Sequence, residues 1–138
     1  MMRLTGKQAL LLAAAFLLPH AAMGEEPTPQ SPFADADMKP AVGARCENLR
    51  RLTEDVPTGP NRIDLAVEGR LTIVHSDGVL TYLGLCGAPA PQVLCVTYSD
   101  NGMKIGDEVA LAGGYSRPDA DHILLDPCLA SPLDGAPE

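Results

Sequence analysis

Positions 63–73 read Ile-Asp-Leu-Ala-Val-Glu-Gly-Arg-Leu-Thr-Ile, and this stretch decides the fold class. Apolar side chains stand at alternate positions, with polar or charged ones between most of them: Ile63, Leu65, Val67, Leu71 and Ile73. A period of two is typical of a strand that packs one face on a core. Gly69 interrupts the pattern, and a glycine within a strand indicates a bulge or a sharp bend. The stretch therefore predicts one long, bent strand.

Four shorter segments further along the chain also predict strands. They cover 79–86, 93–98, 108–115 and 122–126, and turn-forming residues such as Ser76-Asp77-Gly78 separate them. Before the long strand, residues 44–52 have the apolar spacing of a short helix. The chain is predicted to be mainly all-β, with a short N-terminal helix and five strands that form a barrel or a small sandwich.

The order of these segments resembles the OB-fold over residues 62–128. The stretch Ile105-Gly-Asp-Glu-Val-Ala-Leu-Ala-Gly113 is similar to the hydrophobic-Gly-Asp-x-Val-x-x-x-Gly segment that opens the fourth strand in many OB-fold domains. The resemblance implies a five-stranded barrel whose second and third strands form a binding face. OB-folds often carry a helix between strands three and four, whereas only residues 99–102 stand there, so a small β-sandwich is the alternative architecture.

The N-terminus has the three parts of a secretory signal. Arg3 and Lys7 precede the apolar stretch 9–18, and small residues follow up to Gly24. We expect cleavage after Gly24, which places the mature protein in a bacterial periplasm or outside the cell. Residues 25–40 are rich in proline and acids and predict a disordered leader. Residues 41–130 form the expected OB-like β-domain, and 131–138 a flexible tail.

Four cysteines lie in the mature part, at Cys46, Cys86, Cys95 and Cys128. An even number in an oxidising compartment predicts two disulfides, for which three connectivities exist. Cys86 and Cys95 flank a turn-rich segment between two predicted strands, so we expect a bond across that hairpin. By elimination Cys46 then joins Cys128. No Cys-x-x-Cys motif is present, which favours a structural role over a redox-active one.

Charge limits the classes of partner. The 138 residues hold 10 Lys+Arg and 18 Asp+Glu, and removal of the signal leaves eight basic residues against the same eighteen acids. Such an excess disfavours nucleic acid and anionic membrane surfaces, and no nucleic-acid binding or membrane insertion of the mature chain is expected. Three tyrosines are the candidate binding face: Tyr82, Tyr98 and Tyr115.

No catalytic site is predicted. His75-Ser76-Asp77 holds the residue types of a hydrolase triad, but neighbours within one turn cannot place the base between the nucleophile and the acid. The mature part has two histidines, His75 and His122, and neither stands in a metal or haem motif, so no metal and no cofactor are expected.

Two functions follow from this pattern. The first is a secreted, non-catalytic binding module for an envelope protein, peptide or saccharide. The alternative is an accessory subunit of a periplasmic copper or haem system, for which the paired cysteines and soft donors such as Met38 and Met103 are the support.

Overall fold

The computed structural model describes residues 30–36, 38–56 and 59–133. The predicted signal peptide at 1–24 and the tail beyond residue 133 lie outside these residues. The elements follow in the order β1 (Phe33–Asp35), β2 (Ala44–Arg45), α1 (Cys46–Thr53), β3 (Ile63–Ser76), β4 (Thr81–Leu85), β5 (Gln92–Thr97), β6 (Glu108–Asp119) and β7 (His122–Pro132). The mainly all-β class and the short N-terminal helix are confirmed.

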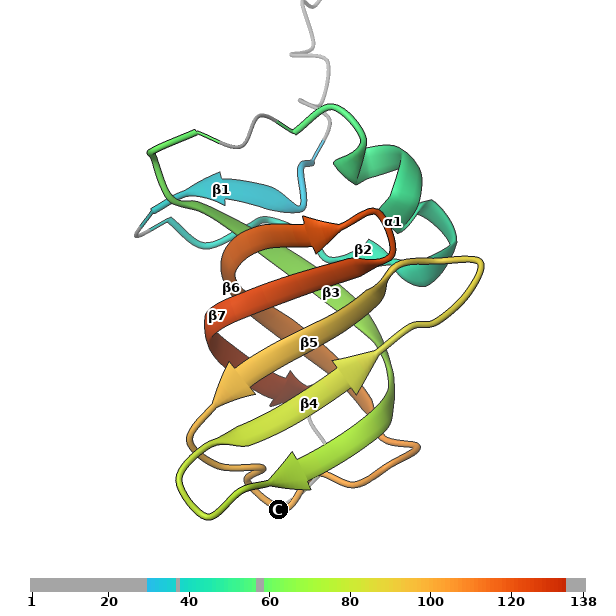
Figure 1. The fold of residues 1–138 in the computed structure, drawn as a ribbon, viewed down its shortest axis with the longest axis vertical. Coiled ribbons are helices and arrows are strands. Elements are labelled where there is room, and N and C mark those ends of the chain that lie inside the picture. Colours follow the sequence, from blue (N-terminus) through green and yellow to red (C-terminus); the bar gives the residue numbers. More distant parts are fainter. Residues whose placement is uncertain (1–29, 37, 57–58, 134–138) are drawn as a thin grey trace, which may run out of the picture.

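Five of the strands close into a barrel (Figure 1). The order around it is β3-β4-β5-β7-β6, and β6 pairs with β3 to complete the ring. β5 and β7 run parallel, while the other barrel pairs are antiparallel. A closed five-stranded barrel is consistent with the OB-like architecture, and the sandwich alternative is wrong.

β3 bends around the barrel and serves two neighbours. Its first half, residues 64–70, pairs with β6, and its second half, residues 71–76, pairs with β4. The irregularity lies between Leu71 and Ile73, not at the predicted Gly69, which stands in regular register opposite Val109. The missing side chain at Gly69 instead leaves room for Cys46, whose Sγ would lie 3.6 Å from a Cβ there. The irregularity between Leu71 and Ile73 lies at the point where β3 changes its pairing partner from β6 to β4.

The barrel interior is filled by aliphatic side chains, and its two ends are closed differently. Leu49 of α1 is fully buried and joins the core from one end, at which Figure 1 shows the helix beside the β6–β7 turn. Met103, in the connection between β5 and β6, joins the core and is 7% exposed. Within the described residues that connection holds no helix, so α1 covers an end of this barrel from the N-terminal side. No helix in the described residues is both long and apolar enough to cross a membrane.

Part of the expected leader belongs to the sheet. Phe33, in β1, pairs with Leu65 of β3, and its ring meets Tyr115 edge-on, with the ring centroids 5.8 Å apart. The expectation of a disordered leader over 25–40 is wrong for this strand, because the aromatic side chain finds a partner far along the sequence. At the other terminus β7 reaches Pro132, past the predicted domain limit at residue 130.

Candidate functional site

All four cysteines form disulfides, as predicted, but their pairing differs. Cys46 joins Cys86 and Cys95 joins Cys128, with Cα–Cα distances of 5.5 and 5.4 Å. The predicted pairs Cys86–Cys95 and Cys46–Cys128 are wrong. The register of the β4–β5 hairpin explains this, because Leu83, and not Cys86, stands opposite Cys95. Cys95 points into the core, and Cys86 lies past the end of β4 with a left-handed φ of 66°.

The three candidate tyrosines come from different parts of the barrel. Tyr82 lies on β4 and Tyr115 on β6, where Tyr115 packs against Phe33. Tyr98 follows β5 and is 84% exposed. Tyr82 stands opposite Val96, which is two residues before Tyr98, whereas Tyr115 lies on β6.

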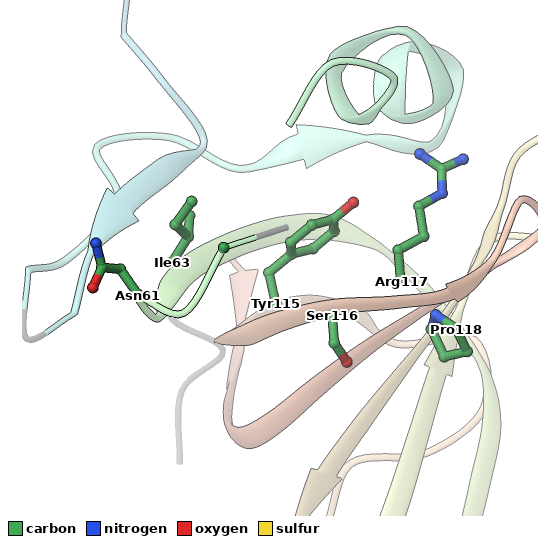
Figure 2. Close-up of a pocket in the computed structure, with 7 residues that line it drawn as sticks. Asn61, Ile63, Tyr115, Ser116, Arg117 and Pro118 are labelled. Carbon is green, nitrogen blue, oxygen red and sulfur yellow. The ribbon is translucent and has the colours of Figure 1, made fainter. Parts of the chain in front are cut away.

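Tyr115 borders a small cavity of about 300 Å³ below α1 (Figure 2). Arg117 is the cationic group in its lining, and Figure 2 shows this side chain pointing toward the helix. The guanidinium donates to the Thr53 carbonyl at 3.0 Å and its hydroxyl at 2.7 Å, and to the Ala120 carbonyl at 2.8 Å. Because these bonds hold the helix end to the β6–β7 turn, we assign Arg117 a structural role.

Tyr82 is fixed by the hairpin that joins β3 to β4. Its hydroxyl donates to Asp77 Oδ2 at 3.0 Å, and its ring stacks on that of His75, which stands directly opposite in the sheet. Asp77 Oδ1 also accepts from the backbone N–H groups of Val79 and Leu80, both at 2.8 Å. These two backbone bonds and the Tyr82 bond lower the pKa of Asp77, and the Asp77 carboxylate raises the pKa of Tyr82. His75-Ser76-Asp77 is therefore a turn whose carboxylate holds the chain reversal.

An apolar strip covers the outside of the barrel over β3, β4, β5 and β7. We call it the outer face, and it consists of Ile73, Tyr82, Leu94, Val96 and Leu124. The inward neighbours of these residues, such as Val93, Cys95 and Leu125, are fully buried, while the outer-face side chains are partly exposed. Gly84 lies in the middle, and a Cβ there would meet the Ile73 Cβ at 2.8 Å, so Ile73 lies across it.

The outer face has a continuous register across four strands. Ile73 stands opposite Gly84, Gly84 opposite Leu94, and Leu94 opposite Leu124. One row further along, Tyr82 stands opposite Val96. Two carboxylates, Asp77 and Asp126, border the strip near Tyr82, and both raise the pKa of Tyr82. The surface is thus a hydrophobic strip with an acidic border.

The described residues offer few groups for metal binding or thiol chemistry. All four cysteines are engaged in disulfides, so none offers a thiolate. Within 30–36, 38–56 and 59–133, no three His, Cys, Asp or Glu side chains gather as metal ligands. His122 instead pairs with Asp119, its Nδ1 lying 2.8 Å from Oδ1.

Comparison with known proteins assigns no residue a role. Neither a protein-family model nor a curated protein matches this sequence. Indications of a function therefore come from the fold and the surface of the barrel.

Sequence reasoning missed the outer face, although a signal was present. Residues 93–96 read Val-Leu-Cys-Val and 123–125 read Ile-Leu-Leu, without the polar alternation that a strand with one wet face should have. Continuous apolar runs are typical of strands covered on both faces. Here the barrel core covers one face, and the other is the outer face.

Proposed function

We propose that this protein is a non-catalytic binding module of the cell envelope and that the outer face binds its partner. One observation carries the proposal: the side chains of Leu94 and Val96 on β5 and of Leu124 on β7 point away from the core and are partly exposed. Exposed apolar patches with a polar border mark interaction sites in soluble proteins. The two disulfides are typical of a protein of an oxidising compartment and support this location.

The chemistry of the outer face narrows the partner. The stacked rings of His75 and Tyr82 offer a flat aromatic surface, and aliphatic side chains extend it across the barrel. The acidic border and the net charge of −8 favour a partner with an apolar centre and basic flanks. We propose a protein or an exposed peptide segment of the envelope, with a saccharide stacked on the rings as the other class.

Affinity capture with matched variants tests the proposal. The tagged protein, a Leu94→Lys variant and an Ile105→Lys variant are used to recover partners from envelope extract, with quantification by mass spectrometry. Leu94 lies on the outer face, while Ile105 is 67% exposed on the β5–β6 connection. A charge in the centre of an interface costs at least about tenfold in affinity. We expect Leu94→Lys to lose the partner and Ile105→Lys to retain it. Equal recovery by all three proteins would overturn the proposal.

The alternative function, an accessory role in a copper or haem system, finds no specific support. Its sequence support was the cysteines and the methionines. The cysteines are bridged and Met103 is buried in the core, so Met38, which is 65% exposed, is the one accessible donor of those named. We therefore do not propose it further.

A further inference from the structure

A second surface, which adjoins the outer face at Val96, forms a groove of about 1060 Å³. Its floor is the outer side of β3, β6 and β7, where the side chains are small: Ala66, Ala110 and Ala112. Residues 38–43 form one wall, and Tyr98 and Leu129 line the opposite side. We call this surface the alanine groove.

The alanine groove gathers unusually exposed apolar side chains. Among the described residues, five large apolar side chains are strongly exposed, and three of them line the groove: Met38 at 65%, Tyr98 at 84% and Leu129 at 80%. The other two, Val79 and Ile105, lie in connections away from it. Exposure on this scale around an apolar floor indicates a surface that is covered in the working protein.

The groove also borders a free strand edge. β7 pairs with β5 only over residues 122–125, and its last part, 128–132, pairs with β6 alone among the described strands. On the other side of the gap, Val96 and Thr97 of β5 pair only with β4. A strand edge with unpaired N–H and C=O groups is a template for pairing with another chain.

Charge and symmetry point to one occupant for this edge. The charged residues that line the groove are two cations, Lys39 and Arg62, and two anions, Asp64 and Glu68, so the groove is balanced in a chain of net charge −8. Two copies can therefore meet here without the like-charge repulsion that acts on the rest of their surfaces.

We propose that a second copy of this chain occupies the alanine groove. Residues 128–132 of the two β7 strands pair antiparallel about a two-fold axis, since antiparallel pairing of identical edges is compatible with two-fold symmetry. Leu129 and Tyr98 of each copy then cover the apolar floor of the other. This surface adjoins the outer face at Val96, which belongs to both, while Ile73, Leu94 and Leu124 lie outside the groove and stay open in the dimer.

Light scattering on the purified mature protein tests the dimer. At roughly 50 µM the expected mass is that of two chains, and Leu129→Glu should weaken association by roughly 30-fold or more, as for an interface hot spot. The control Ile105→Glu adds the same charge at an exposed apolar site outside the groove and should leave the dimer intact. A single-chain mass for the unmodified protein overturns the proposal, as does a Leu129→Glu dimer of unchanged affinity.

Hydrogen exchange tests the pairing without any substitution. The amides of residues 128–131 that do not bond to β6 should exchange at least about tenfold more slowly in the dimer than in the dilute protein, because pairing protects them. Amides of the β3–β4 turn, far along the chain from this edge, should not depend on concentration. A dimer in which those amides of residues 128–131 exchange at the monomer rate would overturn strand pairing. Recovery of a different protein bound at Leu129, with no dimer, would overturn the choice of occupant.

Discussion

At Gly113 the absence of a side chain lets β6 and β7 approach each other. A Cβ there would overlap the carbonyl oxygen of Pro127 and lie 2.9 Å from the Cα of Cys128. Both are backbone atoms and cannot rotate away, so Gly113→Ala must displace β7. We expect urea unfolding to show a loss of about 2–3 kcal/mol in the free energy of unfolding.

Gly87→Ala is the matched control for Gly113→Ala. A Cβ at Gly87 has no neighbour within 4 Å, so this change should stay within about 0.5 kcal/mol. Equal effects of the two substitutions would contradict the close approach of β6 and β7.

Asp119 links the stability of the β6–β7 turn to pH. The bond to the His122 ring, and next the bond from the Asp121 backbone N–H, lower the pKa of Asp119 below 3.8. A lowered folded pKa stabilises the turn above the unfolded value, and this contribution is lost as the pH falls below about 4, through the folded pKa. His122→Ala should move the pKa of Asp119 back toward 3.8. Carboxyl NMR titration measures it, and an unchanged curve would refute the assignment.

Among the elements, α1 is attached to the barrel by Arg50 in addition to Arg117 and the Cys46–Cys86 disulfide. Arg50 donates to the Pro89 carbonyl at 3.0 and 2.9 Å, to the Ala120 carbonyl at 3.1 Å and to Asp121 Oδ1 at 3.0 Å. These bonds join the helix to the β4–β5 and β6–β7 connections. Because the side chain is partly exposed, Arg50→Ala should cost about 1 kcal/mol, or about 4–8 °C in Tm for a domain of this size.

The neighbouring Arg51 provides the control for Arg50. It lies on the same helix with its side chain exposed, so Arg51→Ala should leave the thermal melt within about 2 °C. If the two variants melt at the same temperature, the four hydrogen bonds of Arg50 do not hold the helix.

The two disulfides differ in access, although their loops are similar. Their sequence separations of 40 and 33 residues correspond to about 4 kcal/mol each in the chain-entropy model. Cys95 and Cys128 are buried at 0% and 4% exposure, whereas Cys46 and Cys86 are partly exposed. Under native conditions a reductant should open Cys46–Cys86 first. Alkylation and peptide mapping check the order, and initial labelling of Cys95 and Cys128 would contradict it.

For the whole molecule, local patterns were enough to predict the class of fold. The period of two in 63–73 and the turn at 76–78 are properties of neighbouring residues, and both appear in the barrel. The disulfide pairing was not predictable in this way. It depends on the register of β4 against β5 and on where β7 passes Cys128, which are contacts between distant segments.

The difference between local patterns and contacts between distant segments also explains why the arrangement of the candidate binding residues was not predicted. The positions of Tyr82, Tyr98 and Tyr115 relative to one another depend on how the strands of the barrel pair, which no single segment encodes. Leu94 and Leu124 meet only because β5 and β7 run parallel, thirty residues apart in sequence. The strand β1 likewise depends on the ring contact between Phe33 and Tyr115, which are far apart in the sequence.

A cross-linking map around the barrel tests the central claim, that the outer face binds the partner. A photoreactive amino acid is placed in turn at Leu94, Leu124, Arg51 and Val79 in the producing cells. The first two positions lie on the outer face, while Arg51 and Val79 are exposed elsewhere. The account predicts the same covalent adduct from Leu94 and Leu124, and none of that adduct from Arg51 or Val79. An adduct from Arg51 or Val79 without one from Leu94 and Leu124 would contradict it.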